Sequence, residues 1–201
     1  MGFLSGSVDF TSYRRMMVFI DGENITMRYQ DSIKKGLKPK GNVIHEKDTF
    51  VWEPNFTLNV GKHEIIRAIY YTYAVGDQGK IEEINRNIKS TEFFKNPYSH
   101  LPNFLYPCIF KKENRNRSGK GVDIQMTVDI LNHVYNNNLD TVYLMSGDGD
   151  YLPVINEVIR CGKQIYLAAF SSGLSPKLSN RVDSFHDLDK ICFMPKGDEA
   201  P

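Results

Sequence analysis

The sequence predicts an α/β protein, a Rossmann-like three-layer sandwich around a mainly parallel sheet of five strands. Short apolar runs alternate with amphipathic segments along most of the chain, which is the pattern of strands joined by crossover helices. The first run, residues 16–20, is apolar at every position, as is typical of a central strand covered on both faces. Acidic residues directly follow two of the runs, where open α/β sheets carry their functional groups.

The first strand, at 16–20, ends at an Asp-Gly pair, and the helix predicted over 25–35 ends before Gly36 and Pro39. Residues 38–62 then interrupt the alternation with several turn formers and an aromatic-rich stretch. We expect this insertion to form a hairpin or a flap.

The regular pattern resumes with a strand over 65–75, which is rich in Ile, Tyr and Val. The helix predicted over 80–89 carries one apolar stripe at helical spacing, formed by Ile81, Ile84 and Ile88. A third strand is predicted over 104–110.

The second half of the chain predicts a helix over 122–135, a strand over 141–145, a helix over 152–160, a strand over 164–170 and a short helix over 175–182. The first of these helices has an apolar face formed by Ile124, Val128, Leu131 and Tyr135. If the strands are arranged in the order 3-2-1-4-5, the first and fourth are neighbours and the acidic residues behind them converge.

We expect one domain over residues 16–192, preceded by a leader arm at 1–15 and followed by a tail at 193–201. The formal net charge of +1 excludes a uniformly basic DNA-coating protein, although a local basic patch is compatible with it. The sequence shows no apolar run long enough for a membrane span and no secretory signal, and its three cysteines lack C-x-x-C spacing. These features predict a cytoplasmic protein without a membrane segment.

Carboxylates gather where the predicted strands end. Asp21 follows the first strand, Asp148 and Asp150 follow the fourth, and Asp123 opens the helix over 122–135. Carboxylates that are brought together repel one another, and a divalent cation removes that conflict. Mg²⁺ or Mn²⁺ suits such a site because its candidate ligands are all hard oxygens. Each motif alone is also typical of a turn, but their joint placement favours a metal site.

Placement alone makes Asp21 and Asp148 the best candidates for direct metal ligands. Asp123 would ligate the metal or position the attacking water, and Asp150 would bind through water. Asn24 either holds Asp21 or a phosphate, or caps a helix. We expect two other acids to be exposed on the surface, Glu23 and Asp129.

The chain resembles the NYN domain of the LabA-like family in three stretches that occur in order: FIDGEN at 19–24, KGVD at 120–123 and SGDGDY at 146–151. The resemblance covers residues 17–191 and implies a PIN-like fold and a metal-dependent endoribonuclease that hydrolyses RNA. It also implies an acidic site made of Asp21, Asp123, Asp148 and Asp150, with Asn24 and Ser146 supporting it. Tyr151 stands where the family commonly has Phe, a change that we expect to be harmless. A role of the insertion at 38–62 in substrate selection stays open.

A basic stretch lies immediately before Asp123. It has one acidic residue, Glu113, against five basic residues: Lys111, Lys112, Arg115, Arg117 and Lys120. Beside an acidic metal site, such a stretch would hold the phosphate backbone of RNA. A solvated loop is the alternative interpretation.

Other functions stay open on the sequence. An RNA-binding or regulatory module would keep the fold without turnover. An aspartyl-phosphate phosphatase would use Asp21, but that class usually has a second Asp two residues on, where this chain has Glu23. Trp52 could stack on unpaired bases, although packing in the core or in an oligomer explains it more simply. Assembly into a homo-oligomer is compatible with the sequence.

Overall fold

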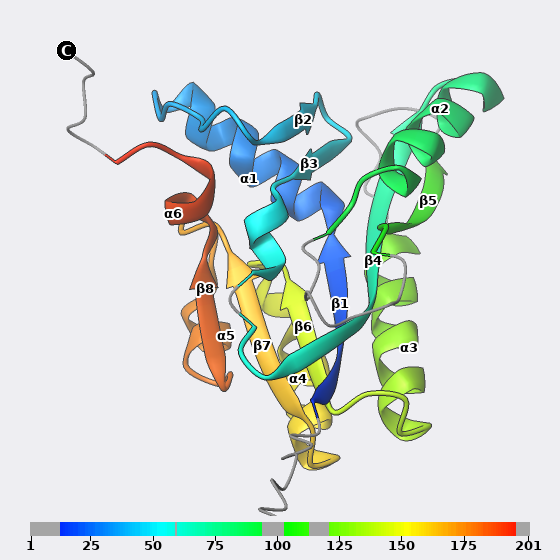
Figure 1. The fold of residues 1–201 in the computed structure, drawn as a ribbon, viewed down its shortest axis with the longest axis vertical. Helices are drawn as coiled ribbons and strands as arrows, with labels where there is room; N and C mark the ends of the chain where they lie inside the picture. The colour runs from blue at the N-terminus through cyan, green and yellow to red at the C-terminus, as the bar shows by residue number, and fades with distance from the viewer. Residues whose placement is uncertain (1–12, 59, 94–102, 113–120, 196–201) are drawn as a thin grey trace, which may run out of the picture.

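Six parallel strands form the central sheet of the computed structural model, which describes residues 13–58, 60–93, 103–112 and 121–195. The strands lie in the order β5-β4-β1-β6-β7-β8 (Figure 1). Their bounds are β1 Arg14–Asp21, β4 His63–Val75, β5 Tyr106–Lys112, β6 Thr141–Met145, β7 Gln164–Ala169 and β8 Ser184–Asp187. The predicted fold class is confirmed, and the five expected strands keep the expected order relative to one another.

The predicted number of strands is wrong, because β8 adds a sixth strand beside β7. This strand has only four residues, and its sequence SFHD lacks an apolar alternation that would reveal it. Its pairing partner β7 supplies the hydrogen bonds that hold it, so its existence depends on another strand and not on its own sequence alone.

Helices cover both faces of the sheet and complete the three layers (Figure 1). One buried cluster joins the sheet to α1 Gly22–Lys34, α2 Gln78–Lys89 and α6 Leu188–Cys192. The cluster on the other face joins it to α3 Gly121–Tyr135, α4 Leu152–Arg160 and α5 Pro176–Ser179. Two short 3-10 helices, η1 Pro54–Thr57 and η2 Gly149–Tyr151, complete the elements.

Helix α3 packs with a different face from the apolar one that its sequence suggests. Ile124, Val128 and Tyr135 are 60%, 53% and 61% exposed. The buried face is instead formed by Val122, Met126, Ile130 and Val134. The helix therefore has two apolar stripes, and contact with the sheet selects one of them.

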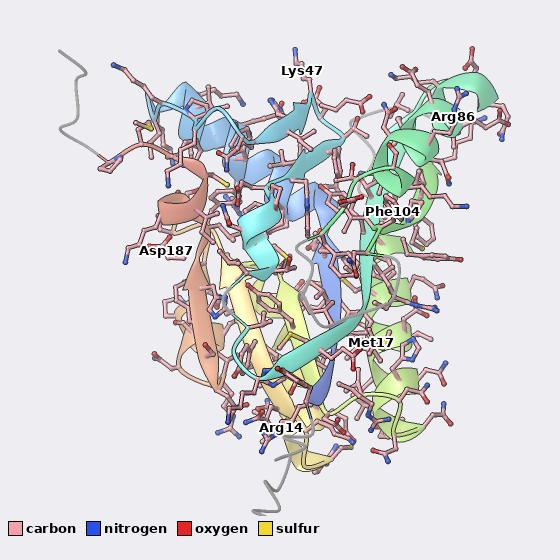
Figure 2. All side chains as sticks on the ribbon, in the orientation of Figure 1. Arg14, Met17, Lys47, Arg86, Phe104 and Asp187 are labelled. Carbon is pink, nitrogen blue, oxygen red and sulfur yellow. The ribbon has the colours of Figure 1, made fainter. Side chains whose placement is uncertain are left out.

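The insertion at 38–62 forms a two-stranded antiparallel hairpin, as expected, from β2 Ile44–Glu46 and β3 Phe50–Trp52. Trp52 is fully buried, lies edge-on to Phe56, and donates its indole N–H to the carbonyl of Glu92 over 3.1 Å. Trp52 thus belongs to the core and cannot stack on a base. Figure 2 shows Lys47 at the hairpin tip and Arg14 at the opposite end of the molecule.

The folded region reaches slightly beyond the expected domain limits. Strand β1 begins at Arg14, and Arg15 forms an ion pair of 2.8 Å with Asp140, so both residues leave the expected leader arm. Phe193, the first residue of the expected tail, is buried and pairs with Pro39. No helix in the described ranges is long and apolar enough to span a membrane.

Candidate functional site

The carboxyl ends of β1 and β6 lie side by side in the middle of the sheet, where the strand order reverses. Asp21 is the last residue of β1, and its Oδ1 accepts the backbone N–H of Asn24 over 3.0 Å, which caps α1. Gly22 is needed between the two elements, because a Cβ there would lie 2.7 Å from the carbonyl oxygen of Tyr71. The Asp-Gly pair therefore marks a close approach to β4 rather than an ordinary turn.

Asp21 is a buried carboxylate, with 4% of the residue exposed. Its Oδ2 accepts the hydroxyl of Ser146 over 3.0 Å, and Ser146 in turn accepts the backbone N–H of Asp148 over 3.2 Å. Burial raises the pKa of Asp21 to about 7, against the lowering effect of its two hydrogen bonds. The negative charges of Asp123 and Glu23 raise this pKa further. Two hydrogen bonds thus hold the Asp21 carboxylate in place, and the negative charges of neighbouring acids act on it.

Asn24 connects the start of α1 to the loop after β6. Its Oδ1 accepts the backbone N–H of Gly147 over 3.1 Å, and its side chain is buried between α1 and the loop after β6. Asp21, not Asn24, is the N-cap of α1. The capping interpretation of Asn24 is therefore wrong, and the residue instead positions the Ser146–Asp148 loop against Asp21.

Asp123 lies in the first turn of α3 and accepts the hydroxyl of Tyr151 over 3.1 Å. Burial raises the pKa of Asp123, as do the charges of Asp148, Glu23 and Asp150, whereas the tyrosine contact lowers it. Sequence reasoning missed this role of Tyr151, because a change between Phe and Tyr looks neutral until the partner of the hydroxyl is known.

Three of the predicted acids share one cavity of about 200 Å³, which we call the acidic cavity. Its walls are formed by Asp123, Asp148, Asp150 and Tyr151 together with Ile124, Thr127 and Val128. Asp150 is exposed, and its backbone N–H donates to Oδ1 of Asp148 over 3.0 Å. The tertiary structure therefore gathers Asp123, Asp148 and Asp150 around one opening, and Asp21 interacts electrostatically with Asp123.

The carboxylates do not form a ready-made metal cage. Among the described residues, no group of three or more His, Cys, Asp or Glu side chains is arranged to hold a metal ion. The donor chemistry still suits Mg²⁺, because this ion uses one or two carboxylates and keeps several waters. Burial is the main cause that raises the pKa values of Asp21 and Asp123, and the charges of neighbouring acids raise both values further.

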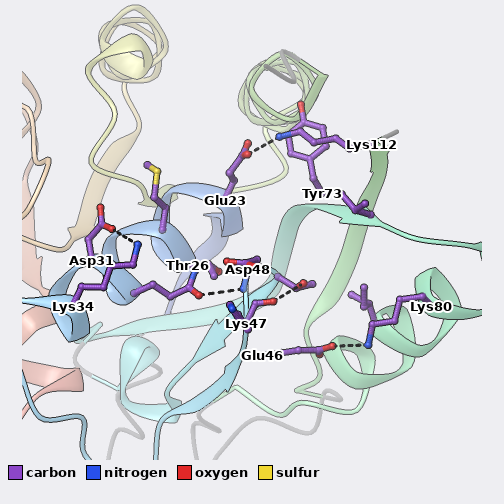
Figure 3. A pocket seen from close by; sticks show the side chains of 15 residues that line it. Glu23, Thr26, Asp31, Lys34, Glu46, Lys47, Asp48, Tyr73, Lys80 and Lys112 are labelled. Atoms are coloured by element: carbon purple, nitrogen blue, oxygen red, sulfur yellow. Dashed lines mark hydrogen bonds and ion pairs between the residues drawn. The ribbon is translucent and has the colours of Figure 1, made fainter. Parts of the chain in front are cut away.

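Only part of the basic stretch can be placed. Lys111 is exposed near the end of β5, whereas Arg115, Arg117 and Lys120 lie outside the described residues. Lys112 forms an ion pair of 2.6 Å with Glu23 and lies 3.7 Å from the ring centre of Tyr73 (Figure 3). Lys112 is thus held beside the site by a carboxylate and a ring.

The two acids that were expected at the surface differ in their surroundings. Glu23 is exposed, as expected, although its ion pair ties it to the edge of the site. Asp129 is only partly exposed and accepts the hydroxyl of Tyr71 over 2.8 Å and the amide of Gln125 over 2.8 Å. The expectation of a solvated Asp129 is therefore wrong, because its helix turns it toward β4.

Comparisons with known proteins identify the chain's relatives. The family model described as the NYN domain matches residues 15–189. An uncharacterised protein of Methanocaldococcus jannaschii is 35% identical over 66 residues, which are 33% of this chain and 28% of that protein. The alignment thus spans little more than a quarter of the curated relative.

A crystal structure of a Vibrio parahaemolyticus protein of unknown function has a similar fold. The TM-score is 0.59 at 19% identity, and the match covers 90% of this chain and 97% of that chain. At this identity the likeness concerns the fold alone.

Proposed function

The chain belongs to the NYN domain family, and from this membership and its acidic cavity we propose that it is a metal-dependent endoribonuclease. NYN domains belong to the PIN-like nuclease superfamily, which supports a nuclease role for this chain. The finer proposal is hydrolysis of RNA phosphodiesters with Mg²⁺ or Mn²⁺ in the cytoplasm. We include the LabA-like subfamily in the proposal because of the FIDGEN, KGVD and SGDGDY stretches.

The observation that carries the proposal is the convergence of four acids from three separate parts of the chain. Asp123, Asp148 and Asp150 line one cavity, and the charge of Asp123 acts on the buried Asp21. Bringing several like charges together costs folding free energy, which a folded protein tolerates where the charges have a task. Binding a divalent cation is the task that suits oxygen donors alone.

Asp123 and Asp148 would hold the metal, with Asp150 acting through water, and the buried Asp21, whose two oxygens accept protein hydrogen bonds, would support them through its charge. A bound Mg²⁺ would lower the pKa of a water and stabilise charge on the phosphate being cleaved. Ser146 and Asn24 hold the loop after β6 against the end of β1 and the start of α1, through their contacts with Asp21 and Gly147.

The surrounding residues of the chain have distinct roles in this proposal. Tyr151 orients Asp123 through its hydroxyl, which favours the ionised form of that carboxylate. Lys111, together with the sequence neighbours Arg115, Arg117 and Lys120, would contact the phosphate backbone of RNA. Lys112 would do so after exchanging its present partner Glu23 for a phosphate.

The contacts of Asp21 disfavour the phosphatase alternative. A nucleophilic carboxylate needs an oxygen that faces the substrate, whereas both oxygens of Asp21 accept protein hydrogen bonds and the residue is buried. Glu23, in the position of the second acid of that class, forms an ion pair with Lys112. An RNA-binding module without turnover shares the same fold, so only activity separates it from a nuclease.

The test is cleavage of a labelled single-stranded RNA after exhaustive chelation, followed by addition of one metal ion at a time. We expect activity with Mg²⁺ or Mn²⁺, none in EDTA, and poor activity with Ca²⁺, whose looser coordination acidifies water less. Asp148→Asn protein prepared in parallel is the control for contaminating ribonuclease. Tight RNA binding without metal-dependent cleavage would favour the binding module, and hydrolysis of an aryl phosphate instead of RNA would favour the phosphatase.

A further inference from the structure

A second cavity, of about 570 Å³, opens beside the acidic site, and we call it the hairpin cavity (Figure 3). It lies between the outer face of α1, the turn of the β2–β3 hairpin, the start of α2 and the carboxyl ends of β4 and β5. Its volume falls within the range of about 300–1,000 Å³ that small-molecule sites occupy. Apart from Glu23 and Lys112, the residues that line it have no role in the proposed chemistry of the acids.

Glu23 connects the hairpin cavity to the acidic site. It lines the hairpin cavity and lies two residues after Asp21. Glu23 lies in the first turn of α1, the helix that Asp21 caps. A nucleic acid with one phosphate at the acidic cavity would therefore have an adjacent nucleotide at the mouth of the hairpin cavity.

The charges that line the hairpin cavity cancel. Its walls contain four lysines, Lys34, Lys47, Lys80 and Lys112, and four acids, Glu23, Asp31, Glu46 and Asp48. Three of the lysines form ion pairs with lining acids, Lys34 with Asp31 and Lys80 with Glu46, both over 3.2 Å, and Lys112 with Glu23. A subsite for a free phosphate would carry an excess of positive charge, so this cavity favours a neutral occupant.

The remaining lining residues offer apolar contact and hydrogen bonding together. Met27 and Val75 contribute exposed apolar surface, and Gln30 and Thr49 contribute partly exposed polar side chains. A nucleobase has this combination, with an apolar ring face and hydrogen-bonding edges. The size, the neutrality and the position beside the acids thus agree on one type of ligand.

We propose that the hairpin cavity binds one unpaired nucleoside of the RNA substrate, next to the phosphodiester that lies at the acidic cavity. The proposal rests on the nuclease function and deepens it, because it makes the β2–β3 hairpin a substrate-selecting element. A base within a duplex is stacked and paired and cannot enter a cavity of this kind, so the nucleotide at this position must be single-stranded.

The first experiment measures binding without cleavage. Methyl resonances of the methionines are recorded in the metal-free protein during titration with each of the four ribonucleosides. We expect the Met27 resonance to shift with at least one of them and the Met194 resonance to stay unchanged. Both side chains are exposed, each residue to 44%, but only Met27 lines the cavity, which makes Met194 a matched internal control.

The second experiment fills the cavity. Met27→Trp should weaken binding of a short single-stranded RNA to Asp148→Asn protein by about tenfold, equivalent to about 1.4 kcal/mol. Met194→Trp should not change it. In Asp148→Asn protein that keeps Met27, an abasic residue next to the mapped cleavage position should weaken RNA binding by a similar factor. In the protein that also carries Met27→Trp, the abasic residue should cause no further loss of affinity.

The outcomes separate the two proposals. Unchanged Met27 resonances, together with equal affinities for intact and abasic RNA, would overturn the nucleoside site even if the protein cleaves RNA. A saturable shift of Met27 in a protein that never cleaves RNA would keep the site and overturn the nuclease. Equal weakening by Met27→Trp and Met194→Trp would also overturn the site, since the effect would not depend on the cavity.

Discussion

Asp21 differs from the other acids of the site because it is almost completely removed from water. Its two oxygens are held by a backbone N–H and by the hydroxyl of Ser146, so its geometry does not depend on a metal. Asp148 is partly exposed and reaches the acidic cavity directly. In the proposed site, Asp21 is therefore a fixed support and Asp148 an accessible ligand. Substituting each residue separately tests its contribution to cleavage.

We expect Asp21→Asn and Asp148→Asn each to lower the RNA cleavage rate by at least about two orders of magnitude, because electrostatics at the metal carry most of such a rate. The same change at Asp129, on the helix that carries Asp123, should leave the rate within a few-fold of the wild type. Single-turnover cleavage measures the rates, and circular dichroism checks the fold. Wild-type rates in folded Asp21→Asn and Asp148→Asn proteins would mean that the acidic cavity is not the active site.

The raised pKa of Asp21 predicts a pH-dependent stability in the absence of metal. Between its ordinary value near 4 and about 7, the folded protein binds this proton and the unfolded chain does not. The contribution of Asp21 to the free energy of unfolding is therefore greatest below about pH 4 and is lost as pH rises toward 7.

Asp21→Asn removes this titration and should gain stability relative to the wild type as pH rises from 4 to 7.5. The gain has an upper limit of about 4 kcal/mol, from about 1.36 kcal/mol per pKa unit. Urea unfolding in EDTA at several pH values measures it. A constant stability difference between the two proteins over this range would show that Asp21 does not titrate as inferred.

At the scale of single elements, helix α3 uses different residues for packing against the sheet and for the candidate site. Its buried stripe faces the sheet, and its first turn carries Asp123 into the acidic cavity beside the exposed Ile124. The exposed stripe contributes little to the core despite its apolar composition. Truncation of a side chain in the buried stripe should therefore lower the free energy of unfolding much more than truncation in the exposed stripe.

Met126→Ala should lower the free energy of unfolding by about 2–5 kcal/mol, because Met126 is fully buried and its loss leaves a cavity. Val128→Ala, two residues further along the same helix, should change it by less than about 0.5–1 kcal/mol, because Val128 is 53% exposed. Urea denaturation of the two variants provides the comparison. Equal losses would indicate that Val128 is covered in solution, as it would be in a homo-oligomer.

The small net charge of the whole molecule conceals an uneven distribution of acidic and basic side chains. The net charge is +1, yet four acids are grouped at the ends of β1, α3 and β6, and the basic stretch comes immediately before one of them, Asp123, in sequence. Such an arrangement suits a polyanion whose backbone is held by cations while one phosphate reaches the acids. The salt dependence of RNA binding reports how many cations take part.

Changing Arg115, Arg117 and Lys120 together to Ala should weaken RNA binding with little dependence on sequence. It should also flatten the plot of log affinity against log salt by up to about 0.7 for each lost contact with single-stranded RNA. The control removes three basic residues from other parts of the chain, Arg86, Lys89 and Lys190. If both triple variants have the slope of the wild type, the basic stretch does not contact the substrate.

Local patterns in the sequence were enough to predict the α/β class, five of the six strands of the central sheet, and the acids of the candidate site. These features depend on periodicity and on strand ends, which neighbouring residues determine. Residues 16–20 predict a central strand because every side chain there must be buried, and Asp21 follows directly at its end. The family resemblance then added a function that periodicity cannot supply.

Contacts between distant residues explain what the sequence did not reveal. The hydrogen bond from Tyr151 to Asp123, the pairing of β8 with β7 and the choice between the two apolar stripes of α3 each depend on a partner in another element. The hairpin cavity likewise exists only because α1, α2 and the β2–β3 hairpin meet. A residue's own neighbourhood in sequence sets its secondary structure, whereas burial, pKa and cavities depend on which surfaces the fold brings together.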